Sequence, residues 1–228
     1  MRFRQADRQA YSGAVPRVRK KTGYHHGALR ETLLDAAVTL IATQGLEQVS
    51  LRELARAAGV SPGAPYHHFP DRAALFAAVA ERGFRMLGLR LRDAASQASS
   101  PAQALQTLLE SYVRFAAEEQ PYFRLMFRPE LRKGKARTSV DLVQAAGDEA
   151  FEVLIDVVRR CQETGNVAPA DVRAITLLAW ALGHGLATLL LDGPLARRSR
   201  LMGDPQEKLV AEATETFVRL SVGGPKKR

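Results

Sequence analysis

The 228-residue sequence has little of several things that would define a different class of protein. Its single cysteine, Cys161, excludes an intrachain disulfide and favours an intracellular, cytoplasmic setting. The charged N-terminus is not followed by an apolar stretch, so we expect no signal peptide. β-Branched residues rarely alternate with polar ones, which argues against long strands. The sequence therefore does not resemble a secreted disulfide scaffold or a β-sheet protein.

Enzyme and metal-site patterns are also missing from the sequence. It contains no GxSxG motif and no P-loop, and Cys161 has no histidine close to it along the chain. The adjacent pairs His25–His26 and His67–His68 have poor spacing for metal ligands, because neighbours on a helix point about 100° apart. No cluster of cysteines or carboxylates supports them. We expect no catalytic residues, no metal site and no cofactor.

One uncharged run, Ile175 to Leu191, raises the question of a membrane span. It is shorter than the roughly 20 residues that a transmembrane helix needs, and it carries His184 and two glycines. We interpret the run as a buried or dimer-interface helix and expect no membrane partner.

What the sequence does contain is an excess of positive charge at its two ends. The net charge is +9, and residues 1–23 hold seven arginines and lysines against one aspartate. The tail GGPKKR, residues 223–228, adds further positive charge, so the body between the ends is nearly neutral. We expect a disordered basic arm over 1–23 and a basic tail over 223–228. Both suit attraction to a polyanion, although basic tails can also serve solubility alone.

The first part of the body carries the boundary signals of two helices. Apolar residues recur at helical spacing from Leu29, and Gly45 ends that segment. Ser50 then opens the capping box SLRE, in which we expect Glu53 to reach back to the start of the helix. Gly59 provides the stop. These signals predict two helices on either side of Gly45.

A third helix is expected only a few residues after Gly59. Ser61 is predicted as its N-cap and Pro62 as its first residue, and Pro70 requires it to end by Phe69. Pro65 is expected to remove one helical hydrogen bond. A long helix should follow, capped by Asp71.

Similar signals predict an all-α chain downstream. A polar loop is expected at RPELRKGKARTS, residues 128–139. The expected helices begin at Ser100–Pro101 and Pro121, span about 140–164 and 169–191, and end with one opened by Asp204–Pro205 and Glu207.

Two short helices joined by a glycine-containing turn describe a helix-turn-helix. The second helix of that motif enters the major groove of DNA, and its N-terminal residues meet base edges and phosphates. Here the residues at its start are small, so the backbone can approach DNA closely. Tyr66, His67 and His68 can add hydrogen bonds or stacking, and His68 can instead form a bond within the domain.

The stretch SLRELARAAGVSPGAPYHHFPDRAALFAAV, residues 50–79, resembles the DNA-binding domain of the tetracycline-repressor (TetR) family. The preceding YHHGALRETLLDAA is similar to the first helix of that family, whereas Pro65 stands where Leu or Ile is more usual. The segment AWALGHGLATLLLDG, with Trp180, His184 and Gly185, resembles the Trp-His-Gly subgroup of C-terminal domains in the family. The segment FRLMF, residues 123–127, agrees with that subgroup.

The resemblance implies an all-α regulator with a three-helix DNA-binding domain at 24–75 and a larger helical ligand-binding and dimerisation domain at 76–222. It also implies a homodimer through the last two long helices, a palindromic operator in double-stranded DNA, and repression relieved by a small apolar or amphipathic effector. Two alternatives stay open. One is a DNA-binding or architectural protein without a ligand, and the other is an enzyme or scaffold that carries a helix-turn-helix.

Two sets of residues follow from the resemblance. Those expected to face DNA are Ser50, Arg52, Ser61, Pro62, Gly63, Ala64, Tyr66, His67 and Arg72. Those expected to line the effector site are Tyr112, Phe115, Phe123, Met126, Phe151, Trp180 and His184. Trp180 and His184 share one helix face because they are four positions apart. For the second set an ordinary aromatic core is the alternative, with His184 a hydrogen-bonded core histidine.

Overall fold

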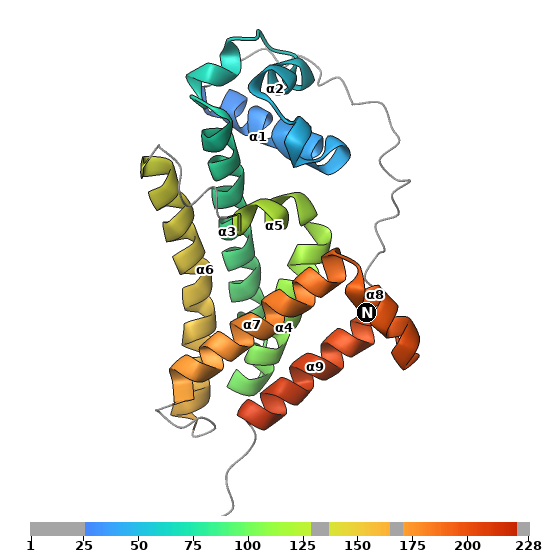
Figure 1. Cartoon of the computed structure of the whole chain (residues 1–228). Coiled ribbons are helices and arrows are strands. Elements are labelled where there is room, and N and C mark those ends of the chain that lie inside the picture. Colours follow the sequence, from blue (N-terminus) through green and yellow to red (C-terminus); the bar gives the residue numbers. More distant parts are fainter. Residues whose placement is uncertain (1–25, 129–136, 165–170, 223–228) are drawn as a thin grey trace, which may run out of the picture. The chain divides into compact units, whose positions relative to one another are not determined.

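The computed structural model describes residues 26–128, 137–164 and 171–222 (Figure 1). The predicted basic arm and tail, and residues 129–136 of the predicted polar loop, lie outside the described residues. The described residues form nine α-helices and two short 3-10 helices and contain no strand, which confirms the all-α prediction. The elements are α1 (His26–Gln44), η1 (Leu46–Gln48), α2 (Leu51–Ala58), η2 (Ala64–His67), α3 (Arg72–Ser96), α4 (Pro101–Glu118), α5 (Gln120–Met126), α6 (Arg137–Glu163), α7 (Val172–Leu191), α8 (Pro194–Met202) and α9 (Gln206–Ser221).

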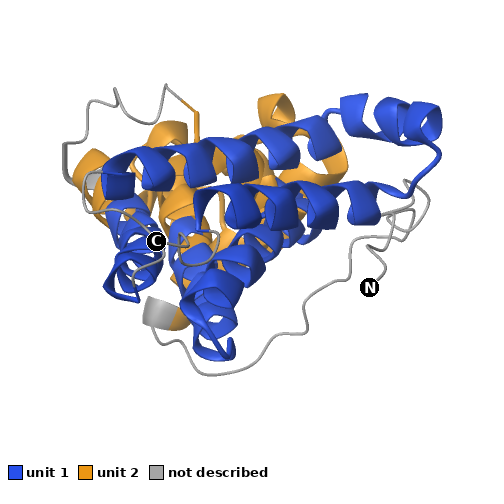
Figure 2. Ribbon diagram, turned by 90° about the horizontal axis from the view of Figure 1, so that it is seen from below, with its two compact units in different colours: residues 1–3, 84–120, 146–228 blue, residues 4–83, 121–145 orange. Residues whose placement is uncertain are grey.

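The chain divides into two compact units, which Figure 2 shows in different colours. Among the described residues, unit 2 comprises 26–83, 121–128 and 137–145, and unit 1 comprises 84–120, 146–164 and 171–222. The division between Gly83 and Phe84 falls inside α3. The domain boundary expected near residue 75 also lies within this continuous helix.

The helix-turn-helix elements of unit 2 pack through one apolar stripe of α1. α1 contacts α2 and η1, and α2 contacts η2. Burial of each leucine or isoleucine in this stripe contributes about 1.5–3 kcal/mol. The stripe consists of Leu33, Leu34, Ala37, Leu40 and Ile41, all buried at the helical spacing that the sequence shows.

Unit 1 is organised around α4, which packs against α7 and α9. The sequence did not predict α8, the short helix between α7 and α9. Its residues, PLARRSRLM, include three arginines and few large apolar side chains, and it is bracketed by Gly193 and Gly203 at φ 89° and 76°. Leu195 anchors it in a small core with Val113 of α4 and Val210 of α9. Local pattern does not predict α8, because Leu195 alone of its residues is buried and the packing of α8 on α7 and α9 forms only in the tertiary structure.

Among the helices after the helix-turn-helix, two predicted caps are confirmed and one is wrong. Ser100 Oγ accepts a hydrogen bond from Gln103 N at 3.2 Å, and Asp71 Oδ1 accepts one from Ala74 N at 2.8 Å. The Asp204 carboxylate instead accepts from Lys208 Nζ at 2.6 Å, and α9 begins after Pro205 without a side-chain cap. The basic residue one turn later competes for the carboxylate.

α7 is long and apolar enough to cross a membrane by length and composition alone. In unit 1, however, one face of it packs on α4 and α9. The opposite face exposes Leu177, Leu178 and Leu189. Leu178 and Leu189 are about three turns apart, so they point to the same side of the helix. α7 therefore has one buried side and one exposed apolar side.

Candidate DNA-binding and effector sites

The first helix of the helix-turn-helix begins and ends as expected. Ser50 Oγ accepts a hydrogen bond from Glu53 N at 3.1 Å, which confirms the N-cap. The Glu53 carboxylate, however, pairs with Arg56 rather than with the start of the helix. Gly59 adopts the left-handed conformation at φ 67°, and Val60 N donates to Ala55 O at 3.0 Å. This C-cap sets the direction in which the chain enters the turn.

The second element is a 3-10 helix, not the α-helix predicted from Ser61 as N-cap and Pro62 as first residue. The Ser61 carbonyl accepts from Ala64 N at 3.0 Å, and the Gly63 carbonyl accepts from Tyr66 N at 3.1 Å. In an α-helix the Ser61 carbonyl would need the N–H of residue 65, which proline lacks. The hydrogen bond expected to be lost at Pro65 is therefore lost, and the turn tightens.

The residues predicted to face DNA are exposed, with one exception. Tyr66 is 50% exposed, although it is a large aromatic residue. Ala64 is wrong as a DNA-facing residue, because it is only 9% exposed and its methyl group belongs to the core. The 3-10 turn places Ala64 and Pro65 inward and the residues on either side outward. The exposed members of the set are Ser50, Arg52, Ser61, Pro62, Gly63, Tyr66, His67 and Arg72.

Arg72 has partners within unit 2 that the sequence did not indicate. Its guanidinium donates to the Leu46 carbonyl at 2.6 Å and lies 4.7 Å from the centre of the Phe76 ring. These contacts connect the start of α3 to η1, directly before the Ser50 cap. They favour a role for Arg72 in holding the motif together.

Four of the residues predicted for the effector site meet in unit 1. Tyr112 Oη of α4 lies 3.0 Å from His184 Nδ1 of α7. The Trp180 ring centre lies 6.1 Å from that of His184 and 5.7 Å from that of Phe151 on α6. A Cβ at Gly183 would lie 3.3 Å from Leu109 Cδ2, so the glycine permits the close approach of α7 to α4. The prediction that Trp180 and His184 share a face is confirmed.

Burial shifts the ionisation of this group toward neutral forms. It raises the pKa of Tyr112 well above its usual range, while a hydrogen bond with the Trp180 side chain acts in the opposite direction. It also lowers the pKa of His184 below 6.5. Since both rings are neutral at pH 7, the Tyr112 hydroxyl can donate to an unprotonated His184 Nδ1. The four side chains therefore form an aromatic cluster whose polar contacts include the hydrogen bond between Tyr112 Oη and His184 Nδ1.

The other three members of the predicted effector set are buried side chains. Phe115 is fully buried on α4, below the Arg90 guanidinium of α3. Phe123 and Met126 are buried on α5 in unit 2, where Met126 and Tyr122 contact Gly83. These residues are core side chains within their own units.

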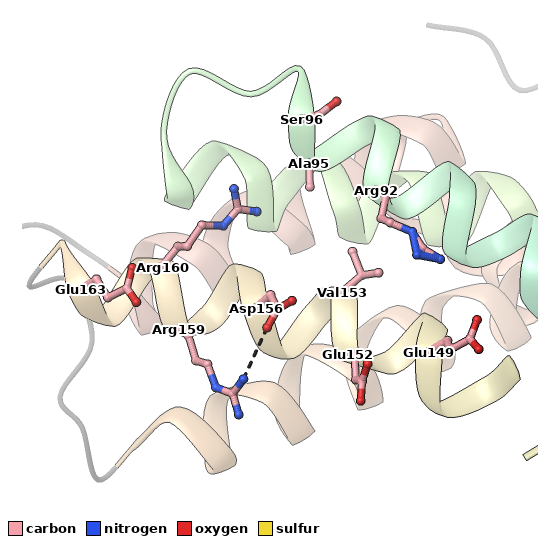
Figure 3. A pocket seen from close by; sticks show the side chains of 10 residues that line it. All are labelled: Arg92, Ala95, Ser96, Glu149, Glu152, Val153, Asp156, Arg159, Arg160 and Glu163. Atoms are coloured by element: carbon pink, nitrogen blue, oxygen red, sulfur yellow. Dashed lines mark hydrogen bonds and ion pairs between the residues drawn. The ribbon is translucent and has the colours of Figure 1, made fainter. Parts of the chain in front are cut away.

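A separate groove of about 520 Å³ lies in unit 1 between α3 and α6 (Figure 3). It is lined mostly by charged residues, and Arg159 forms an ion pair with Asp156 at 3.4 Å. None of the seven residues predicted for the effector site lines it. The lining residues are Arg92, Ala95, Ser96, Glu149, Glu152, Val153, Asp156, Arg159, Arg160 and Glu163.

Sequence reasoning missed the ion pairs that hold unit 2 together. Arg82 of α3 pairs with Asp35 of α1 at 2.7 Å and with Glu31 at 3.6 Å. Arg128 pairs with Glu47 of η1 at 3.8 Å. The partners are far apart along the chain and form no local motif, so the sequence carries no signal for them.

Two family models match the chain. The model described as "Bacterial regulatory proteins, tetR family" matches residues 33–79, and the model "Tetracyclin repressor-like, C-terminal domain" matches residues 105–217. Together they cover more than half of the chain. The second match agrees with the predicted kind of C-terminal domain, and the Trp-His-Gly subgroup itself stays a prediction.

Similar proteins agree with these matches. The HTH-type transcriptional repressor Rv1474c of Mycobacterium tuberculosis is 29% identical over 200 residues, which cover 86% of this chain and 96% of that protein. A solved structure of a Rhodococcus sp. RHA1 protein of unknown function is 35% identical, with a TM-score of 0.73, and covers 89% of this chain and 100% of its own.

A second similar solved structure is that of AibR in complex with isovaleryl coenzyme A and operator DNA. Its TM-score is 0.61 at 15% identity, with 85% of this chain and 98% of that chain covered, so the likeness shows the fold. The two family matches, the curated relative and the capped helix-turn-helix agree: the chain belongs to the tetR family of bacterial transcriptional regulators.

Proposed function

We propose that the chain is a repressor that binds a palindromic operator as a homodimer and releases it when a small molecule binds. The observation that carries the proposal is the exposed edge of η2. Ser61–Gly63 and Tyr66–His67 are exposed on the second element of the helix-turn-helix, while Ala64 and Pro65 between them are buried. A half-exposed tyrosine beside small residues suits close contact with a DNA groove.

Within this proposal the exposed residues have different roles. The start of α2, at Ser50, and the turn before η2, at Ser61, present backbone N–H groups to phosphates. Tyr66 and His67 reach base edges, and Arg52 adds a phosphate contact. Arg72 acts indirectly by holding η1. Residues 1–23 add salt-sensitive, sequence-independent affinity through their seven basic side chains.

The homodimer would form through α7 and α9. α7 exposes Leu177, Leu178 and Leu189 on one side, and α9 exposes Leu220. An exposed apolar helix face of this kind marks an interaction site. A two-fold axis between the copies would place the two reading elements about one helical turn of DNA apart, which requires a palindrome.

The effector site would lie at Tyr112, Phe151, Trp180 and His184. Their rings provide an apolar surface with a single polar point, the Tyr112–His184 pair. This chemistry suits a small apolar or amphipathic molecule. Release requires that the molecule bind the DNA-incompetent conformer more tightly than the competent one. We place the protein in the cytoplasm, where it would meet DNA, and propose no enzymatic activity.

The proposal is tested by selecting bound sequences from a random DNA pool with the purified full-length chain. We expect one palindrome, which is lost in Tyr66→Ala and kept in Leu142→Ala. Leu142 is 46% exposed on α6 and serves as the matched control. The selected operator is then used to screen small apolar and amphipathic compounds for release.

Other outcomes would contradict separate parts of the proposal. Recovery of a single half-site would exclude the dimer, and binding without any preferred sequence would exclude the regulator. Screened compounds that never release the operator would favour a DNA-binding protein without a ligand. Removing residues 1–23 should reduce the salt dependence of binding and leave the selected sequence unchanged. Loss of the sequence preference on that truncation would contradict the role of the arm.

A further inference from the structure

α3 is one of the chain segments that belong to both units. Its residues up to Gly83 lie in unit 2 with the helix-turn-helix, and from Phe84 onward they lie in unit 1 (Figure 2). The helix face proposed for dimerisation, on α7, is also in unit 1. In a dimer, the attachment of α1 and η2 to the first part of α3 would therefore influence the separation of the two reading elements.

An ion-pair cluster fixes this attachment at the last turn of α3 within unit 2. The Arg82 guanidinium lies 2.7 Å from Asp35 Oδ1 and 3.6 Å from Glu31 Oε2, both on α1. The Arg82 side chain is 33% exposed, whereas Asp35 and Glu31 are 64% and 55% exposed, so water screens the pairs and each is worth at most about a fivefold change in an equilibrium constant. One arginine thus holds two carboxylates on successive turns of α1.

α5 packs beside this cluster. A Cβ at Gly83, the residue after Arg82, would lie 2.9 Å from Met126 Sδ and 3.0 Å from Tyr122 Cβ. Tyr122 also acts electrostatically on Arg82. Beyond α5, Arg128 pairs with Glu47 of η1 at 3.8 Å. Within unit 2, α5 therefore packs on α3 at Gly83, and the segment directly after α5 pairs with η1 through Arg128.

Ion pairs and apolar packing constrain α1 in different ways. Leu33, Leu34 and Val79 are buried in unit 2, and their burial resists separation of the helices. The hydrophobic effect is non-directional, so it favours close helices without selecting one particular pair of partner groups. The hydrogen bond from Arg82 to Asp35 is directional and fixes the register of α1 on α3.

We propose that Arg82 is a positioning residue for operator binding: its pairs with Asp35 and Glu31 fix α1 on α3, next to α5, and thereby set the half-site spacing that the dimer accepts. The inference rests on the proposed function. It assigns to Arg82 no contact with DNA. Its consequence is selectivity for spacing, separate from selectivity for base sequence.

The test measures affinity of the full-length chain for the selected operator and for versions with the half-sites moved apart or together by one and two base pairs. Wild type is expected to prefer one spacing. Arg82→Ala should bind the preferred operator about fivefold more weakly, as expected for the loss of one partly exposed ion-pair cluster. It should also discriminate less between spacings while keeping the base preference within each half-site.

Three variants sharpen the result. Arg82→Lys retains the positive charge but not the planar guanidinium with its several N–H donors. Its preference for half-site spacing should therefore be intermediate between those of wild type and Arg82→Ala. Asp35→Asn changes only the partner and should reproduce the loss of spacing preference even if Arg82→Ala does not fold. Arg90→Ala is the matched control, since Arg90 is on the same helix, is 35% exposed and pairs with Glu118 of α4 at 2.5 Å. It should keep the wild-type profile.

The inference is overturned if Arg82→Ala and Asp35→Asn keep the wild-type spacing profile. It is also overturned if Arg90→Ala flattens the profile equally, because the effect would then reflect general loss of stability. If wild type selects no palindrome, the proposed function itself fails. A wild-type palindrome with an unchanged Arg82→Ala profile removes this inference alone.

Discussion

Among the residues that the structure describes, tyrosine and histidine lie close together at two places, and these differ in almost every physical respect. Tyr66 and His67 lie on η2, both exposed. Tyr112 and His184 come from different helices, and their polar atoms are 3.0 Å apart in a largely buried setting. The side chains of Tyr66 and His67 are available to another molecule, whereas those of Tyr112 and His184 contact each other. The same residue types therefore indicate recognition or packing only once burial is known.

The largest contrast should appear in folding stability. Tyr112 is 6% exposed, so Tyr112→Ala leaves a cavity and should lower the free energy of unfolding by about 3–5 kcal/mol. Tyr66→Ala should change it by no more than about 0.5 kcal/mol, because little of that side chain is packed. Urea denaturation of both variants measures the difference. Equal losses would show that Tyr66 is a core residue in solution.

For operator affinity, substitution of Tyr66 should have a larger effect than substitution of Tyr112. Tyr66→Ala should weaken binding to the selected operator by about 1–3 kcal/mol, or roughly 5- to 150-fold, because a base contact is lost. Tyr112→Phe, which keeps the ring packed, should leave the affinity of the ligand-free protein within about twofold. Fluorescence anisotropy with labelled operator gives both values. A Tyr112→Phe variant that binds as weakly as Tyr66→Ala would remove the distinction.

The Tyr112 hydroxyl should have a smaller effect on stability than the ring. Tyr112→Phe removes the hydrogen bond to His184 Nδ1 and should cost about 1 kcal/mol of unfolding free energy. Because the two groups are coupled, His184→Phe should lower the free energy of unfolding by less in the Tyr112→Phe variant than in wild type. A double-mutant cycle measures the coupling, and strictly additive losses would show that the pair contributes nothing.

The smallest expected effect is a pH dependence carried by His184. Burial lowers the pKa of His184 below 6.5 in the folded chain, so the unfolded chain takes up the proton first as the pH falls. The free energy of unfolding is therefore highest, as far as His184 is concerned, above about pH 6.5. It decreases as the pH falls from there toward the folded-state pKa. The free energy of unfolding, measured by urea denaturation between pH 5 and 8, should depend less steeply on pH in His184→Gln than in wild type. An unchanged slope would mean that His184 is solvated in the folded protein.

Much of the fold was readable from the sequence because its signals are local. Ser50, Asp71 and Ser100 cap helices through bonds to residues three positions away, and Gly59 ends α2 through its own backbone conformation. The lost hydrogen bond at Pro65 follows from the covalent structure of proline. The all-α class and the helix-turn-helix were therefore determined by the sequence.

The tertiary structure decided which side chains are buried and which distant residues pair, and local sequence signals contain neither. Ala64 is buried although its neighbours are exposed, since a 3-10 turn replaces the predicted α-helix. Asp204 binds Lys208 rather than capping α9, and α8 depends on the burial of Leu195. The pairs Tyr112–His184 and Arg82–Asp35 join residues far apart along the chain. Sequence patterns fix hydrogen bonds within a few residues, whereas burial and long-range pairing exist only after the helices have packed.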